Sequence, residues 1–223
     1  MLEISLLDAD EARSLGQKLM SAHWIDGNVT SGPGAALAKR NRQLPETSAA
    51  ATQARKLIQN ALAASGQFLS AALPRTVYPP LFNRYGIGDS FGEHVDNAIR
   101  VDHTGGQMRT DLSATVFLCD PDGYEGGALE IETACGRISS KLGAGQMLLY
   151  PATSLHRVTP VTSGERICSF FWMESLVRDE TARATLYDLD QSIQALALDR
   201  GGDDSQVLRL TQIYHNLVRR WTT

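Results

Sequence analysis

The sequence predicts an α+β protein in which a central β domain lies between helices at both ends of the chain. From about residue 75 to 175, short apolar or alternating runs are separated by Gly, Pro, Asp and Ser, as in LFNRYG, SATVFL, GALEIET, GQMLLYPA and RICSFFWM. Strands at this spacing are typical of an all-β sandwich or barrel. Before and after this region, apolar residues recur at helical intervals. We therefore divide the chain into an N-terminal helical shoulder (1–74), a β core (75–176) and a C-terminal helical extension (177–223).

The N-terminal shoulder is expected to hold one strand and two helices. LEISLL at 2–7 alternates and is rich in branched residues, which is typical of a strand. Residues 8–22 follow as a helix, with Asp8 as a candidate N-cap. After a Gly-rich loop, residues 47–73 are rich in alanine, with apolar residues at helical intervals. We expect this segment to be the longest helix of the chain, ended by Pro74.

The C-terminal extension is expected to form two helices. Their segments, DETARATLYDLDQSIQALAL and DSQVLRLTQIYHNLVRRWTT, are joined by DRGGDD. The second segment carries Leu, Ile, Tyr and Trp along its length, and these would pack either on the β core or on a second copy of the chain. The pattern is therefore compatible with a homodimer.

Composition narrows the classes of function. A net charge of −4 and a pI near 5.7 argue against a nucleic-acid partner. The N-terminus carries acids where a secretory signal would carry Lys or Arg, and the best apolar run, ICSFFWM, is far short of the roughly 20 residues of a membrane span. We therefore expect a cytoplasmic protein without a membrane partner. Cys119, Cys135 and Cys168 are expected to be buried free thiols, which fits a reducing compartment.

The stretch FGEHVDNA sets His94 and Asp96 two residues apart. In a β-strand such residues share a face, so an imidazole and a carboxylate could hold one metal ion. So short a motif also occurs by accident, and a surface polar pair is the competing interpretation. His156, at the end of an apolar strand, adds a third candidate ligand. Two imidazoles and one carboxylate leave three positions open, as in non-haem Fe(II) oxygenases, where a 2-oxo acid such as 2-oxoglutarate could take two and O2 the third.

Arg166 follows His156, the last candidate ligand, ten residues later. Through the turn TSGE, the chain would fold back as a hairpin that brings His156 and Arg166 to neighbouring strands. A guanidinium there can hold the free carboxylate of a chelated dicarboxylate by two parallel hydrogen bonds, and Tyr85 could add one more donor. The alternatives are a surface ion pair of Arg166 with Glu165 and a core packing role for Tyr85.

Longer stretches resemble a known family. RTDLSATVFLCDPDGYEGGALEI, the spacing of HVD to LHRVTPVTSGER, the upstream WIDGNVTSG and KRNRQL, and the tail YHNLVRRW resemble the bacterial PKHD-type hydroxylases, a branch of the prolyl-4-hydroxylase-like Fe(II)/2-oxoglutarate dioxygenases. The resemblance covers nearly the whole chain and implies a double-stranded β-helix (jelly-roll) core flanked by helices. It implies an iron site of His94, Asp96 and His156, with Arg166 for the distal carboxylate of 2-oxoglutarate and L-ascorbate keeping the iron ferrous. In WMES, glutamine is expected where Glu174 stands, and a cavity-facing Glu174 would alter substrate preference.

These observations predict an Fe(II)/2-oxoglutarate-dependent hydroxylase that releases succinate and CO2. The alternative class is a non-catalytic, cupin-like metal-binding or sensing module, which would have no need of Arg166. A zinc hydrolase would need a glutamate near the metal as a general base. Glu93 is next to His94 in the sequence, but side chains alternate along a strand, so Glu93 is expected on the opposite face. The primary substrate, a peptidyl residue or a small metabolite, is not defined by the sequence, and a link to iron acquisition is an expectation from the resemblance alone.

The loop RVDHTGGQM lies between the ligand strand and the next one, where a lid over the site would be. His103 is its candidate for substrate contact, and Arg100, Asp102 and Arg109 share the loop. Loop histidines are nevertheless more often exposed to solvent than functional.

Overall fold

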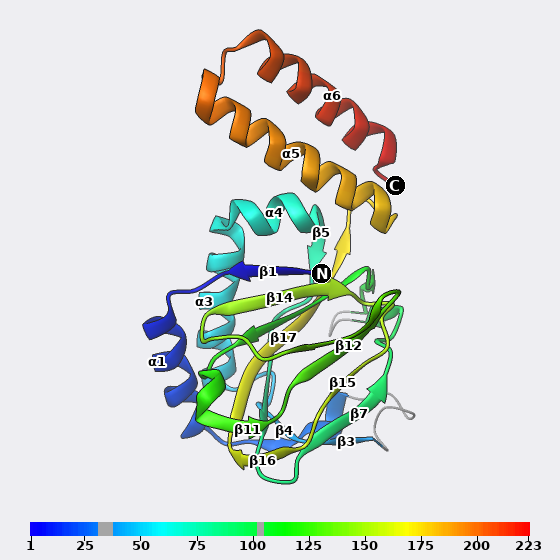
Figure 1. Ribbon diagram of the computed structural model, residues 1–223. Coiled ribbons are helices and arrows are strands. Elements are labelled where there is room, and N and C mark those ends of the chain that lie inside the picture. Colours follow the sequence, from blue (N-terminus) through cyan, green and yellow to red (C-terminus); the bar gives the residue numbers. More distant parts are fainter. Residues whose placement is uncertain (31–37, 102–104) are drawn as a thin grey trace.

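Two β-sheets that pack against each other form the centre of the molecule (Figure 1). The computed structural model describes residues 1–30, 38–101 and 105–223. The larger sheet joins eight of the described strands, in the order β1 (Leu2–Ser5), β14 (Gln146–Pro151), β10 (Leu112–Phe117), β17 (Arg166–Ser175), β6 (Leu81–Tyr85), β4 (Arg42–Gln43) and β2 (Ile25–Asp26), with β5 (Pro74–Val77) also on β17. The smaller sheet has the order β13 (Gly136–Ser140), β12 (Leu129–Thr133), β15 (His156–Val158), β7 (Ser90–His94) and β3 (Lys39–Arg40). Helices and strands are both present and the described strand pairings are antiparallel, so the expected mixture of helices with a β core is confirmed.

Two short ribbons complete the β region. One pairs β8 (Ile99–Val101) with β9 (Gln107–Arg109), and the other pairs β11 (Tyr124–Gly126) with β16 (Val161–Gly164). Two single turns of 3-10 helix, Gly27–Thr30 and Pro121–Gly123, lie in the connections. The five apolar runs expected as strands in the β core correspond to β6, β10, β12, β14 and β17.

Strand β17 crosses the larger sheet and separates two environments. Its pairing with β10 and β6 fixes both of its edges. Ile167 and Met173 point into the apolar cluster under the N-terminal helices. Arg166, Phe170 and Trp172 alternate with them and line a cavity between the two sheets. One strand therefore joins the packed core to the cavity wall.

The N-terminal helices cover the outer face of the larger sheet (Figure 1). Helix α1 (Ala9–Met20) begins at Asp8, whose carboxylate accepts hydrogen bonds from the backbone amides of Asp10 and Glu11, so the expected N-cap is confirmed. The apolar side chains of α1 and α3 (Ala49–Ala64) pack against residues of β10, β14 and β17 in one buried cluster.

The expectation of a single long helix over 47–73 is wrong. Ser65 is extended, with φ −83° and ψ 100°, and it ends α3 and caps a second helix, α4 (Gly66–Ala72), by accepting from the amide of Phe68. A serine followed by glycine favours a break because Ser competes for backbone donors and Gly has low helix propensity. The left-handed Leu73, with φ 42°, and then Pro74 end α4. The longest described helix is instead α5 (Glu180–Arg200).

Helices α5 and α6 (Ser205–Trp221) form an antiparallel pair that leaves the end of β17 and projects from the β core (Figure 1). Contacts with α4 hold α5 in place, including hydrogen bonds from Gln67 to Tyr187 and from Ser70 to Asp190. None of the described helices combines the length and apolar character that a membrane crossing requires.

The cysteines differ from expectation at two positions. All three are free thiols and Cys168 is buried, but Cys119 is only partly buried and Cys135 is exposed in the turn between β12 and β13. A reversal between two strands faces solvent even where the flanking strands are apolar, which accounts for the exposure of Cys135.

Candidate functional site

A cavity of about 750 Å3, counted to its open mouth, lies between the two sheets. It brings together the five residues predicted from the sequence to form the site: His94, Asp96, His156, Tyr85 and Arg166. The first three form a group that could hold a metal ion, because one ligand atom from each lies within 4.8 Å of the others.

The two histidines are direct neighbours across strands. His94, the last residue of β7, pairs in register with His156, the first residue of β15. Paired residues of antiparallel strands share a face, so both rings enter the cavity, with their centroids 4.2 Å apart. Asp96 lies two residues beyond the end of β7 rather than within the strand, and its Oδ2 is 3.8 Å from His156 Nε2.

Hydrogen bonds orient each of these side chains. Nδ1 of His94 donates to the carbonyl of Gly92 at 2.8 Å, and Nδ1 of His156 donates to the carbonyl of Ser154 at 2.9 Å. Since a carbonyl only accepts, the proton of each neutral ring is on Nδ1 and the lone pair of Nε2 is free for a metal. Ser113 on β10 donates to Asp96 Oδ2 at 2.6 Å, which fixes the carboxylate.

The environment keeps His94 neutral. Burial, followed by repulsion from His156, lowers the pKa of His94 to about 4. Phe91 stacks on the ring with centroids 3.6 Å apart and excludes water from that side. A neutral imidazole at physiological pH is the form that binds metal.

Glu93 takes no part in this group. Its carboxylate accepts a hydrogen bond from Arg137 at 2.6 Å on the exposed face of the smaller sheet. The alternation expected between Glu93 and His94 is therefore confirmed, and Glu93 is not available as a base for a metal-bound water.

Arg166 faces the metal group from the other sheet. The expected hairpin with neighbouring strands is wrong: β15 belongs to the smaller sheet and β17 to the larger one, because β16 pairs with β11 instead of with β15. His156 and Arg166 meet across the cavity. Arg166 is only 1% exposed, and its Nε and Nη1 have no hydrogen-bond partner among the described residues. A buried cation with unpartnered nitrogens favours the binding of an anion from outside the chain.

The surface ion pair with Glu165 was the alternative interpretation for Arg166. Glu165 binds Arg84 rather than Arg166, so the surface ion pair is absent from the described contacts of Arg166. Tyr85 pairs in register with Arg166, and its ring centroid lies 5.2 Å from the guanidinium carbon. Burial raises the pKa of Tyr85 to about 12, so its hydroxyl remains a neutral donor.

Gly127 allows the chain to pass close to Arg166. It has φ +62°, and a Cβ at this position would lie 3.2 Å from Arg166 Cδ and 3.0 Å from side-chain atoms of Tyr124 and Val161. A larger residue would be strained in the left-handed region and would press on the guanidinium stem. Gly127 therefore leaves room for the side chain of Arg166.

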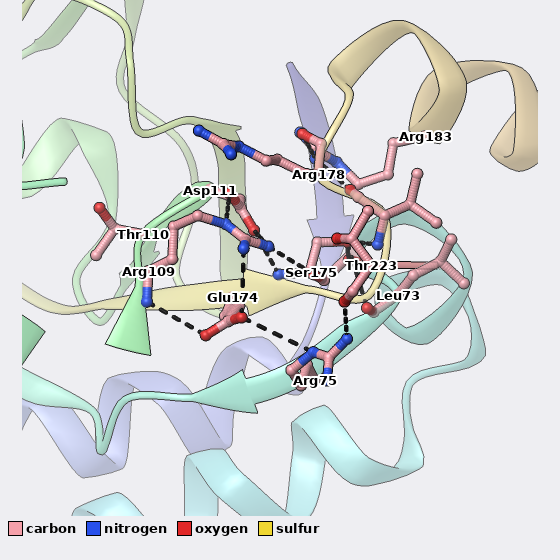
Figure 2. Close-up of polar contacts among 12 residues, drawn as sticks. Leu73, Arg75, Arg109, Thr110, Asp111, Glu174, Ser175, Arg178, Arg183 and Thr223 are labelled. Carbon is pink, nitrogen blue, oxygen red and sulfur yellow. Dashed lines mark hydrogen bonds and ion pairs between the residues drawn. The ribbon is translucent and has the colours of Figure 1, made fainter. Parts of the chain in front are cut away.

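Glu174 does not line the cavity. Figure 2 shows its carboxylate between Arg75 and Arg109, at the far end of β17. Its Oε1 lies 3.8 Å from Arg75 Nε and 3.5 Å from Arg109 Nη1, and its Oε2 accepts from the Arg109 amide at 3.2 Å. Arg109, in turn, binds Asp111 through its side chain at 2.7 Å. Glu174 thus joins β17 to β9 instead of contacting a bound substrate.

The loop residues proposed to form a lid divide into two groups. Asp102 and His103 lie outside the described residues. Arg109 belongs to the network of Glu174 and is not among the residues that line the cavity. Arg100, on β8, does line it.

Sequence reasoning missed most of the cavity wall, including several polar residues. Lys39 and Asn83 line the wall, and Ser113 donates to Asp96, a candidate metal ligand. Lys39 falls in KRNRQ, whose burial alternates along β3 and β4 although every residue is polar. Because buried and exposed residues of this segment are equally polar, the sequence shows no hydrophobic alternation. Only the assignment of the segment as a strand could have shown that Lys39 faces inward.

The residues present fit an iron site with a dicarboxylate cosubstrate. Two imidazoles and a carboxylate with open positions suit non-haem iron, and a buried guanidinium lacking a partner suits a carboxylate. The fold and site therefore define a non-haem iron oxygenase. In agreement, the family model of the 2OG-Fe(II) oxygenase superfamily matches residues 80–174. A second model, the PKHD-type hydroxylase C-terminal domain, matches residues 180–223.

Similar proteins narrow the class to one family. A PKHD-type hydroxylase of Rhizorhabdus wittichii is 58% identical over 95% of this chain and 92% of its own length. Another PKHD-type hydroxylase, of Burkholderia thailandensis, is 55% identical over 99% of this chain and 98% of its own length. The chain belongs to the PKHD-type hydroxylases, a family of Fe(II)/2-oxoglutarate-dependent dioxygenases.

A solved structure supports the fold. The prolyl-4-hydroxylase of Pseudomonas putida aligns with a TM-score of 0.53 and 19% identity, covering 78% of this chain and 91% of its own. At this identity the likeness concerns the fold alone, which is that of the prolyl hydroxylase-like oxygenases.

Proposed function

We propose that this dioxygenase hydroxylates a C–H bond of its substrate, with His94, Asp96 and His156 as iron ligands and Arg166 as the partner of 2-oxoglutarate. The single observation that carries the proposal is the pairing, in one cavity, of the three-ligand group with a fully buried guanidinium whose Nε and Nη1 have no partner among the described residues.

Each side chain has a defined task in this proposal. The Nε2 atoms of the two histidines and the carboxylate of Asp96 bind the metal on one side and leave the other side open. Arg166 orients 2-oxoglutarate by its distal carboxylate, with the Tyr85 hydroxyl as a further donor. When bound, iron with 2-oxoglutarate and O2 supplies the oxidation, which yields succinate and CO2. The protein excludes water with Phe91 and holds the reactants in place.

The test is an anaerobic titration of the metal-free protein with Fe(II) and then 2-oxoglutarate. A 2-oxo acid chelated to ferrous iron gives a weak visible charge-transfer band, and admission of O2 should release succinate. Asp96→Ala should abolish both signals because it removes one of three ligands. Glu93→Ala is the matched control, since it removes a nearby carboxylate on the exposed face. Full turnover in Asp96→Ala would refute the metal assignment.

A cupin-like metal-binding or sensing module remains the contrasting proposal. Such a module would bind iron through the same three residues but would gain nothing from Arg166. Bound iron with neither a band nor succinate would favour it. The buried position of Arg166 supports the oxygenase instead.

Several finer expectations stay proposals. We propose that the two facing sheets are a double-stranded β-helix, that residues 1–74, 75–176 and 177–223 act as shoulder, core and extension, and that L-ascorbate keeps the iron ferrous. The C-terminal helices are a candidate homodimer surface. The substrate is a peptidyl residue or a small metabolite, and iron acquisition is the process to test first.

A further inference from the structure

Asp96 is the only one of the three candidate metal ligands that lies outside a strand. His94 and His156 are paired residues of β7 and β15, so the smaller sheet fixes both rings. Asp96 belongs to the connection 95–98 between β7 and β8, in which the other three residues are exposed. Hydrophobic packing therefore does little to hold this connection. A metal ligand on it needs another support, because a site binds well only when its ligands are kept close to the productive geometry.

Thr110, in the connection between β9 and β10, contacts the chain directly after Asp96. Its backbone amide donates to the carbonyl of Ala98 at 2.9 Å, and its Oγ1 donates to the carbonyl of Asn97 at 2.5 Å. Thr110 is itself 6% exposed, so both hydrogen bonds come from the packed side of the connection. Because Asn97 is the next residue after Asp96, the hydroxyl of Thr110 restrains the backbone that carries the ligand.

The residues on either side of Thr110 are themselves fixed to β17 (Figure 2). The amide of Arg109 donates to Glu174 Oε2 at 3.2 Å, and the Arg109 guanidinium binds the carboxylate of Asp111. That carboxylate also accepts from the amide of Ser175 at 2.8 Å, and the amide of Asp111 donates to a backbone carbonyl of β17 at 3.0 Å. Thr110 therefore lies between two anchored neighbours, which makes it a firm support for a connection that packs poorly.

We infer that Thr110 is a positioning residue for the metal site, which sets the place of Asp96 through the backbone that follows it. This inference rests on the proposed function, because it takes Asp96 as an iron ligand. Ser113 orients the carboxylate itself, whereas Thr110 restrains the chain that carries it. The segment RTD at 109–111 thereby has a defined task. Its outer residues bind β17, and its middle residue binds the connection that holds the ligand.

The test removes the hydroxyl and measures metal affinity separately from folding. Thr110→Val keeps the shape of the side chain but loses the Oγ1 donor, whereas Thr110→Ser keeps the donor. Chelator competition with Ni(II), a metal that imidazole ligands suit, gives the dissociation constant of each protein. We expect Thr110→Val to weaken Ni(II) binding about tenfold or more, as is typical when a group that orients a ligand is lost. Thr110→Ser should restore most of the affinity, and Thr110→Ala replaces Thr110→Val if valine disturbs the fold.

Ser169→Ala is the matched control for a loss of stability. The Oγ of Ser169 donates to the carbonyl of Leu81 at 2.9 Å inside the larger sheet, so the variant removes the same kind of hydrogen bond. Ser169 is fully buried but is not among the residues that line the cavity. The control should lower the free energy of unfolding in urea and leave the dissociation constant of Ni(II) within about twofold of the wild type.

A double-variant cycle tests whether Thr110 acts through Asp96. In Asp96→Ala the two histidines still bind Ni(II) weakly, and Thr110 has no ligand left to position. Adding Thr110→Val to Asp96→Ala should therefore change the dissociation constant by less than about twofold. A role in the general stability of the cavity would instead lower the affinity in both backgrounds.

The outcomes separate this inference from the proposed function. Wild-type protein that binds no Ni(II), or binds it as well after Asp96→Ala, refutes the metal assignment of the proposed function. If Asp96→Ala weakens binding but Thr110→Val and Thr110→Ala do not, the inference alone is overturned. It is also overturned by a loss of affinity that Thr110→Ser does not restore, that Ser169→Ala reproduces, or that persists in the Asp96→Ala background.

Discussion

Replacing Arg166 by methionine should weaken 2-oxoglutarate binding and yet stabilise the ligand-free protein. The bound dicarboxylate would lose a fully desolvated charge-assisted pair, a loss of about 2 to 5 kcal/mol, which corresponds to roughly 30-fold or more in dissociation constant. In the free protein the same guanidinium is 1% exposed, with Nε and Nη1 unpartnered. Removing it relieves a penalty of about 1 to 3 kcal/mol, and methionine fills much of the same volume.

Two measurements, each made on the wild type and on the Arg166→Met variant, test this prediction. Calorimetric titration of 2-oxoglutarate into the Mn(II)-loaded protein gives the dissociation constant, and urea unfolding without ligand gives the free energy of unfolding. Arg84→Met is the control, because Arg84 lies on the neighbouring strand β6 and its partner is Glu165. Unchanged 2-oxoglutarate affinity would refute the role of Arg166. Strong destabilisation of the free Arg166→Met protein would show that its guanidinium has partners in the folded chain.

The remaining predictions concern the supports of the site. Ser113→Ala removes the 2.6 Å hydrogen bond to Asp96, so metal affinity should fall by about 10- to 100-fold in a chelator competition, with the fold kept by circular dichroism. Glu174→Gln weakens the contacts with Arg75 and Arg109 and should lower the free energy of unfolding in urea by about 1 kcal/mol, while 2-oxoglutarate affinity, measured by calorimetry, stays within twofold. For pH, the pKa of His94 is about 4 in the folded protein and 6.5 for the ordinary side chain, so the unfolded chain takes up the proton first as the pH falls. The free energy of unfolding of the metal-free protein should therefore be highest above pH 6.5 and fall by about 3 kcal/mol toward pH 4. In denaturant titrations, the unfolding free energy of a His94→Gln variant should depend less on pH.

The core strands and the pair of His94 and Asp96 could be predicted from the sequence because both depend on local patterns. His94 and Asp96 are close in the chain, and apolar runs with turn residues between them mark each core strand. The hairpin from His156 to Arg166 was wrong because sequence neighbours need not be sheet neighbours. The few residues of β16 pair with β11, which sends the chain from one sheet to the other.

Other features could not be predicted for physical reasons. The break at Ser65 depends on a hydrogen bond to Phe68 that competes with continued helix, and propensity differences there are small. Lys39 and Arg100 reach one cavity from strands far apart in the chain, and charge alone is usually a sign of a solvated surface. The burial of Lys39 and the position of Arg100 beside the cavity arise only from tertiary structure.

The charges of the cavity and the polar network at the end of β17 belong to one arrangement. A buried cation such as Arg166, whose Nε and Nη1 have no partner among the described residues, lowers the stability of the folded protein unless a ligand supplies the missing charge. Strand β17 positions Arg166 and also supports the neighbouring strand pair. Arg166 is its first residue, and near its other end Glu174 binds Arg109 on β9 (Figure 2). Strand β9 pairs with β8, on which Arg100 lies. The strand's opposite face is fixed in the apolar core beneath the helices, which makes it a rigid support. The proposed binding of 2-oxoglutarate at Arg166 and the position of Arg100 at the cavity wall therefore depend on one strand.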